Sequence, residues 1–132
     1  AHYADKHRGF CVEFDGSMEP FASAREVVYA ERVPELNLVD LIDNIPNDQR
    51  FEKAMLLTKA ACWSYESEWR VVHATANDRI RYPRGALKRV YLGSRISHAA
   101  AVVLTSAAQC LGVAVSRMKL VERSFSLEVV AL

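Results

Sequence analysis

The spacing of hydrophobic residues along this chain predicts a series of strands and two main helices. In residues 10–15, FCVEFD, the hydrophobic Phe10, Val12 and Phe14 alternate with more polar residues, which is typical of a half-buried strand. Similar patterns predict further strands over residues 26–33, 65–74, 79–83, 87–93, 113–122 and 125–132. We expect the last two to form a hairpin, and a phase slip near Ser116 predicts a β-bulge.

Two longer segments have helical spacing. Residues 48–62 carry a mostly apolar stripe that predicts a helix with Asp48 as its N-cap, the stripe being Phe51, Met55, Thr58 and Cys62. Residues 97–111 are rich in alanine, begin at Ser97, a suitable N-cap, and end before Gly112. Shorter helical stretches are predicted over residues 35–43 and over residues 2–7, the latter closed by Gly9 in a left-handed conformation.

These elements predict an α+β fold with a single mixed or antiparallel sheet and two main packing helices. The 132 residues, about half of them hydrophobic, are enough for one domain with a hydrophobic core. We therefore expect residues 1–132 to form a single domain. The alternation predicts that eight residues are largely buried in the sheet: Phe10, Val12, Phe14, Val28, Trp69, Val71, Val90 and Leu92.

Composition excludes some classes of protein. The net charge of +1 creates no global field that would draw the chain to nucleic acid or to a membrane, and the longest apolar run, residues 99–104, is too short to span a bilayer. Cys11, Cys62 and Cys110 lie far apart, so we expect reduced, separate, metal-free thiols in a reducing, cytoplasmic setting. The glycine-rich nucleotide-binding motifs, HExxH and GxSxG are absent from the sequence.

The segment YESEWRVV carries the most distinctive chemistry. Strand alternation puts Glu66, Glu68 and Arg70 on one face, where two carboxylates roughly 7 Å apart couple electrostatically. One glutamate would then keep a raised pKa and act as an acid or base, the other would anchor a sugar hydroxyl, and Arg70 would steady either. The alternative is a solvated strand face whose charges pair with neighbouring strands.

The opening residues, AHYADKHRGFC, gather two histidines, a tyrosine and a cysteine. Imidazole and thiolate are zinc ligands, but this spacing matches no zinc pattern, so we predict no metal site. We expect instead that His2, Tyr3 and His7 form a wall beside the glutamate strand, with one histidine hydrogen-bonded to Glu66, Glu68 or Tyr65. The alternative is that both histidines point into solvent.

A basic segment follows the glutamate strand. It contains no acidic residue, and its cations are interleaved with tyrosines, which allows contact with phosphate or nucleic acid. The equally acidic residues 31–52 favour the simpler interpretation that the two segments face each other or water. The cations concerned are Arg79, Arg81, Arg84, Lys88 and Arg89, with Arg95 further along.

Four spaced motifs, HYADKHRGFCVEFD, VVYAERV, KAACWSYESEWRVV and LKRVYLGSRI, occur in this order. Together they resemble the bacterial family named domain of unknown function 2971 (DUF2971), from residue 2 to about residue 96. The marks of the resemblance are His2, Tyr3, His7, Gly9, Cys11, Lys59, Trp63, Glu66, Glu68, Trp69, Arg70 and Gly93. Family members usually carry an upstream segment that this chain lacks, so the resemblance implies the C-terminal part of a longer protein.

The Glu-x-Glu pattern is also similar to the catalytic strand of ADP-ribosyltransferases. That similarity implies that Glu68 stabilises an oxocarbenium-like transition state and that Glu66 orients the acceptor, with NAD as the cofactor. One hypothesis is therefore an NAD-using, ADP-ribosyltransferase-like enzyme acting as a toxin or defence effector. The other is a non-catalytic binding or interaction module in which Glu66, Glu68 and Arg70 form a structural charge network.

Overall fold

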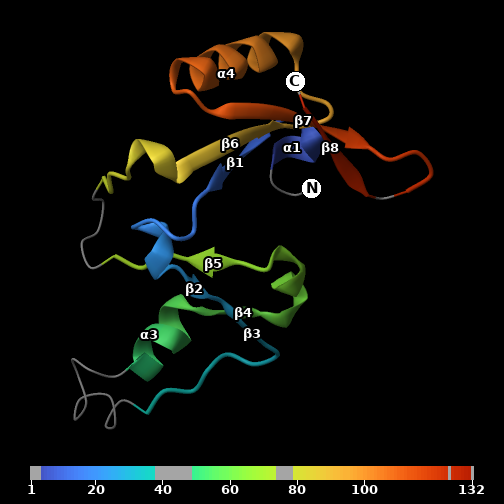
Figure 1. Ribbon diagram of the computed structural model, residues 1–132. Helices are drawn as coiled ribbons and strands as arrows, with labels where there is room; N and C mark the ends of the chain where they lie inside the picture. The colour runs from blue at the N-terminus through green and yellow to red at the C-terminus, as the bar shows by residue number, and fades with distance from the viewer. Residues whose placement is uncertain (1–3, 38–48, 74–78, 125, 132) are drawn as a thin grey trace. The chain divides into compact units, whose positions relative to one another are not determined.

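The computed structural model describes residues 4–37, 49–73, 79–124 and 126–131. The chain divides into two compact units. Unit 1 consists of residues 1–19 and 81–132, and unit 2 consists of residues 20–80 (Figure 1). Both contain helices and strands, which confirms the α+β class. Among the described residues, no helix is long and apolar enough to cross a membrane.

Unit 1 is built on a four-stranded mixed sheet in the order β1-β6-β7-β8. Its strands are β1 (Phe10–Phe14), β6 (Leu87–Leu92), β7 (Ala114–Leu120) and β8 (Leu127–Ala131). The β6 and β7 strands are parallel, and the other two pairs are antiparallel. The helix α4 (His98–Cys110) makes the crossover between the parallel strands and covers one face of the sheet (Figure 1). The β7–β8 hairpin was predicted and is confirmed.

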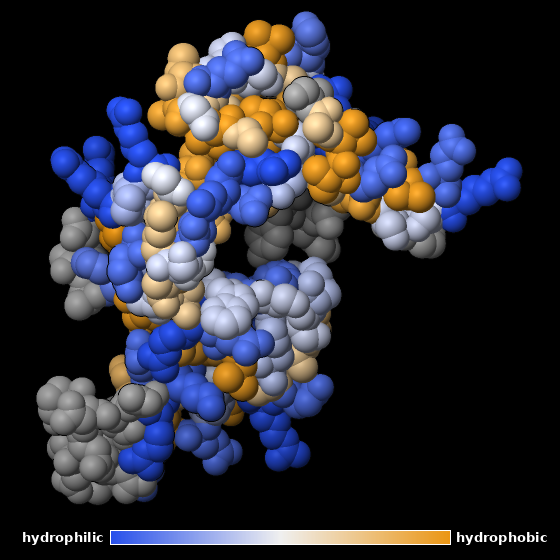
Figure 2. Space-filling view, in the orientation of Figure 1, coloured by the Kyte–Doolittle hydropathy of each residue, from blue (hydrophilic) through white to orange (hydrophobic). Residues whose placement is uncertain are grey.

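The core of unit 1 lies between α4 and the sheet. Its buried residues are Val90, Leu92, Ile96, Ala101, Ala108 and Val113. The predicted helix signals act as expected: the Ser97 hydroxyl accepts a hydrogen bond from the Ala100 amide at 3.2 Å, and Gly112 ends the helix with a φ of +68°. Hydrophobic side chains also gather over β7 and β8, away from the core, in the space-filling view (Figure 2).

The N-terminal turn of unit 1 differs from its prediction. The segment α1 (Ala4–His7) is not a right-handed helix, because Asp5, Lys6 and His7 have φ values of 42°, 52° and 69°. Gly9 has no positive φ, so its predicted role as a left-handed cap is wrong. The turn is held by hydrogen bonds from outside it: the Gly93 amide donates to the Gly9 carbonyl and the Arg95 amide to the His7 carbonyl, at 2.9 and 3.0 Å.

Unit 2 contains two short ladders. The strands β2 (Arg25–Glu26) and β5 (Trp69–Arg70) are antiparallel, and β3 (Val28–Ala30) and β4 (Thr58–Ala60) are parallel. The helix α3 (Gln49–Leu56) precedes β4, and the 3₁₀ turns are η1 (Phe21–Ser23) and η2 (Ala61–Glu66), with η3 (Arg84–Ala86) in unit 1. The chain changes its partner at Val27, whose amide donates to the Glu68 carbonyl, while the Val28 amide donates to the Leu57 carbonyl.

The predicted single sheet is wrong, because within the described ranges the strands form three separate sheets. The change of partner at Val27 separates the two ladders of unit 2. The predicted strand over 26–33 splits into β2 and β3, and the helix predicted to reach residue 62 ends at Leu56. Thr58 pairs with Val28 instead. Its hydroxyl donates at 2.8 Å to the Lys53 carbonyl, which also accepts from the Leu57 amide at 3.1 Å.

Several predicted positions are also wrong. Four of the eight residues expected to be buried are exposed: Phe10 (50%), Val12 (37%), Val28 (40%) and Trp69 (62%). In unit 1, α4 covers one face of the sheet and only part of that face. In unit 2, the two-stranded ladders are narrow. Residues 79–83 form no strand. The register shift lies between Glu13 and Phe14, not near Ser116. The predicted Asp48 cap and most of the helical stretch 35–43 lie outside the described residues.

Candidate functional site

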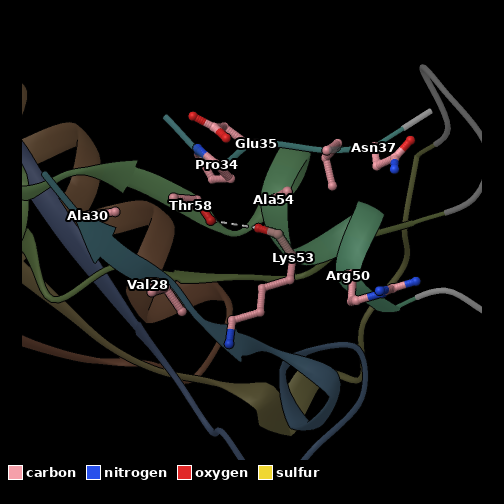
Figure 3. Close-up of a pocket in the computed structure, with 10 residues that line it drawn as sticks. Val28, Ala30, Pro34, Glu35, Asn37, Arg50, Lys53, Ala54 and Thr58 are labelled. Carbon is pink, nitrogen blue, oxygen red and sulfur yellow. Dashed lines mark hydrogen bonds between the residues drawn. The ribbon is translucent and has the colours of Figure 1, made fainter. Parts of the chain in front are cut away.

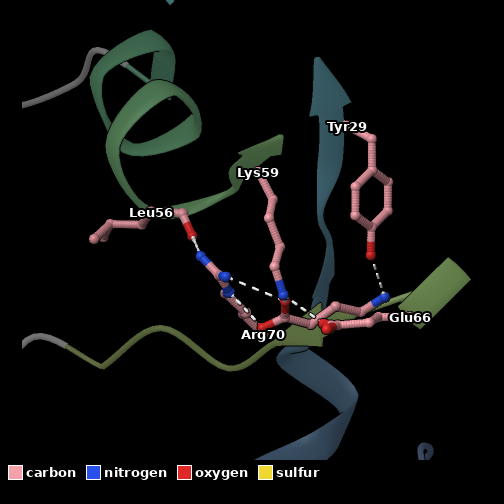
Figure 4. A network of polar contacts seen from close by, with 6 residues as sticks. Tyr29, Leu56, Lys59, Glu66 and Arg70 are labelled. Carbon is pink, nitrogen blue, oxygen red and sulfur yellow. Dashed lines mark hydrogen bonds and ion pairs between the residues drawn. The ribbon is translucent and has the colours of Figure 1, made fainter. Parts of the chain in front are cut away.

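Unit 2 gathers two glutamates and two cations into one charge network, defined as Lys59, Glu66, Glu68 and Arg70. Arg70 Nε donates to Glu68 Oε1 at 2.7 Å and Nη2 to Oε2 at 3.2 Å, so the guanidinium holds the carboxylate with two hydrogen bonds. Lys59 Nζ lies 3.0 Å from Glu68 Oε2 and also pairs with Glu66 (Figure 4). Both oxygens of Glu68 are therefore occupied by cations.

The network is anchored to the backbone of neighbouring elements. Arg70 Nη1 donates to the Leu56 carbonyl at the end of α3, at 2.6 Å. The Glu68 amide donates to the Tyr29 hydroxyl on β3, at 2.8 Å (Figure 4). The contacts thus connect α3, β3, β4, η2 and β5. In the described part of the chain, the buried hydrophobic residues of unit 2 are Val27 and Leu57. The charge network adds contacts between elements around this small apolar core.

The two glutamates come together by a route that differs from the predicted one. Tyr65 and Glu66 belong to the 3₁₀ turn η2, and Ser67 ends it in a left-handed conformation, with a φ of 47° and a ψ of 49°. A continuous strand over residues 65–74 is therefore wrong, and only Trp69 and Arg70 are paired in β5. What brings Glu66 and Glu68 together is Lys59, which contacts both.

Electrostatics keeps Glu68 ionised. Hydrogen bonds from Arg70, and then from Lys59, lower the pKa of Glu68 to about 2. The same contacts raise the pKa of Lys59, chiefly through Glu66, and that of Arg70, chiefly through Glu68. The raised glutamate pKa expected of an acid catalyst is thus wrong for Glu68, because its partners favour the charged form. The Glu66 side chain is only 8% exposed and is paired with Lys59.

The β3–β4 ladder separates this network from a pocket. In its register, Val28 lies opposite Thr58 and Tyr29 opposite Lys59, and successive side chains point to opposite faces of a strand. Tyr29 and Lys59 face the charge network, whereas Val28 and Thr58 line a pocket of about 450 Å³ (Figure 3). Residues 34–37 and α3 complete the pocket. Its lining combines apolar residues with four polar ones: Glu35, Asn37, Arg50 and Lys53.

The structure brings together some of the predicted site residues. Glu66, Glu68 and Arg70 meet, and the exposed Tyr65 lies nearby in the chain, its ring 6.0 Å from that of Trp63. His2 and Tyr3 lie outside the described residues. His7 belongs to unit 1 and the glutamates to unit 2, so the predicted hydrogen bond between them stays a prediction.

Sequence reasoning missed Lys59 as a member of the site. It was placed inside the predicted helix 48–62, whereas it lies on β4 beside Tyr29. A signal was present: two glutamates so close together need cations within reach, and Lys59 is the first lysine before them in the sequence. Nothing in the sequence pattern singled out the pocket beyond β3 and β4.

Two of the cations predicted to contact nucleic acid have partners in unit 1. Lys88 Nζ lies 3.0 Å from Asp15 Oδ2. Arg89 Nη1 donates to the Ser116 hydroxyl at 2.9 Å. Nucleic-acid contact through these two residues and through Arg79, Arg81 and Arg84 stays a prediction.

The described residues contain no group of three or more histidine, cysteine, aspartate or glutamate side chains arranged to hold a metal ion. Cys11, Cys62 and Cys110 are each free and exposed. The thiols are therefore open to reagents in solution.

Comparison with known proteins gives a family match. The family described as protein of unknown function (DUF2971) matches residues 1–71, just over half of the chain. The matched region contains β1 and the whole charge network. No curated protein matches the chain, and no solved structure does, so the comparison with ADP-ribosyltransferases depends on the Glu-x-Glu pattern alone.

Proposed function

The chain belongs to the DUF2971 family of unknown function, and we propose that its unit 2 is a non-catalytic binding module. In this proposal the charge network is structural and the pocket beyond the β3–β4 ladder is the ligand site. The observation that carries it is the state of Glu68: both of its carboxylate oxygens are bound by cations.

Such a glutamate is unsuited to the chemistry of the alternative hypothesis. The role implied for Glu68 there, stabilising an oxocarbenium-like transition state, needs an ionised carboxylate with an oxygen free for the substrate. Glu68 would have to release Lys59 or Arg70 before it could bind a ribose hydroxyl. Each released cation would then lose a charge-assisted hydrogen bond. An NAD-using enzyme with Glu68 and Glu66 as catalytic residues therefore has less support than a module in which they are fixed.

The position of the network fits a supporting role. Tyr29 and Lys59 face the network from the ladder whose other face lines the pocket. Fixing these two residues fixes Val28 and Thr58, their neighbours in sequence, because a strand shift would move both faces together. The network thus stabilises the pocket wall from behind, and this preorganisation is what a binding site requires.

The decisive experiment measures nicotinamide release from NAD by the full chain and by its Glu68→Gln variant. We expect no release above the buffer rate from either protein, and a loss of stability in the variant. Glu31→Gln is the matched control, because Glu31 is an exposed glutamate of the same unit without a described ion pair. Release by the wild type and the control that disappears in a folded Glu68→Gln variant would establish the enzyme and refute the module.

A further inference from the structure

The N-terminal motif builds a second pocket, in unit 1. This pocket of about 400 Å³ lies on the sheet face that α4 leaves open. The register places Cys11 opposite Tyr91 and Met118 opposite Val129, so these side chains line the open face together with Leu127. Val90 and Leu92 point to the other face, where they are buried under α4.

The wall of this pocket is a strained turn. Asp5, Lys6 and His7 all have positive φ, a conformation that side chains with a Cβ rarely adopt. Gly93 lies against the turn so closely that an added Cβ would stand 2.7 Å from the Gly9 carbonyl oxygen and even nearer to that of His7. Strained backbone that the surrounding structure holds in place clusters at sites that clamp ligands.

Several polar groups on this face are already paired, and His7 is a further polar residue of the pocket lining. The Tyr91 hydroxyl donates to Glu13 at 2.6 Å, and Arg89 lies over the Tyr91 ring and donates to the buried Ser116 hydroxyl. Arg89 Nε is also 3.9 Å from Glu13. These contacts hold the Tyr91 side chain, which lines the pocket. The lining that remains for a ligand is mostly apolar and includes the sulfur atoms of Cys11 and Met118.

We infer that this pocket binds a small, uncharged, planar aromatic molecule of one or two rings. Its volume falls in the range of small-ligand sites. Sulfur atoms and a fixed tyrosine ring favour aromatic partners. Glu13 and Arg89 neutralise each other, and the remaining titratable side chain of the described lining that could carry a positive charge is His7. A charged ligand would therefore find at most one counter-ion there. The site lies in unit 1 and is independent of the function proposed for unit 2.

The chain supplies its own test through its three free cysteines. Cys11 lines the pocket, whereas Cys62 and Cys110 are exposed elsewhere. The full chain is alkylated with iodoacetamide with and without 2-naphthol, and the rate at each cysteine is followed by peptide mass spectrometry. At about four times its dissociation constant, 2-naphthol slows the alkylation of Cys11 about fivefold. The rates at Cys62 and Cys110 stay unchanged.

Two neighbouring valines of β8 provide matched variants. Val129 lines the pocket, and Val130 is exposed on the opposite face. Val129→Trp fills the pocket and abolishes the protection of Cys11, and Val130→Trp retains it. Protection retained in both variants overturns the location of the site. If Val129→Trp does not fold, the alkylation rates of the wild type decide the matter. No slowing at Cys11, or equal slowing at all three cysteines, overturns the inference. Equal protection of Cys11 by 2-naphthoate overturns the statement that the ligand is uncharged.

Discussion

Replacing Glu68 with glutamine removes the negative charge at the centre of the charge network and keeps the size of the side chain. Arg70 and Lys59 then lose their common anion, and one donor of the glutamine amide faces a guanidinium. We expect unit 2 to become less stable at neutral pH, because the network joins its helix to three of its strands.

The lowered pKa sets the size of the effect. A fall from 4.5 to about 2 corresponds to at most about 3.5 kcal/mol, since each pKa unit is worth about 1.4 kcal/mol. The Glu68 side chain is 28% exposed, and solvent screening reduces this to about 1–2 kcal/mol. Because the folded pKa is depressed, the stabilisation is complete above the unfolded value of 4.5 and is lost as the pH falls toward 2.

The assay is urea unfolding followed by tryptophan fluorescence between about pH 6 and pH 2. Both tryptophans, Trp63 and Trp69, belong to unit 2, so the signal reports on that unit. The free energy of unfolding of Glu68→Gln should be lower than that of the wild type above pH 5, and the two curves should converge toward pH 2. The Glu31→Gln control should follow the wild type. A difference that is absent at pH 6, or that persists unchanged at pH 2, would refute the structural role.

Three further predictions concern unit 1, and each is measured as the free energy of urea unfolding followed by circular dichroism. Gly93→Ala should destabilise the unit by about 2 kcal/mol or more, because its Cβ would collide with two backbone carbonyls, whereas Gly16→Ala, with open space around it, should have little effect. Ser97→Ala should cost about 1 kcal/mol through the lost N-cap, and Ser106→Ala, inside the same helix, should cost nothing. Leu92→Ala should cost about 2–5 kcal/mol, since Leu92 is fully buried; a cost below 1 kcal/mol would contradict this view of the core.

Local signals predicted the fold where the partner of an element is nearby in structure and sequence. The helix from Ser97 to Gly112 carries its own cap and stop, and the alternation of Val90 and Leu92 matches their burial under it. The predicted end of the helix at residue 62 is wrong because hydrophobic periodicity carries no information on distant partners. The apolar stripe continues through Thr58, but Thr58 pairs with Val28 in a parallel ladder.

The candidate site was predicted in part for the same reason. Glu66, Glu68 and Arg70 do meet, as their spacing suggested, yet Ser67 turns the chain between the glutamates in a way that strand alternation cannot show. Lys59, the cation that joins them, is seven residues before Glu66 and on another strand. A pairwise contact of this kind depends on tertiary structure and leaves no periodic trace in the sequence.

The pairing of β1 with β6 has a consequence for synthesis. Phe14 lies opposite Leu87, so about 70 residues separate partners in one antiparallel pair, and all of unit 2 is inserted between them. At a translation rate of about 5–20 residues per second, β1 waits roughly 4–15 s on the ribosome before β6 emerges. During that interval unit 2 can fold from its own continuous chain, while Phe10, Val12 and Phe14 remain without their strand partner. Newly made β1 thus stays open to contact with other nascent chains until β6 is available.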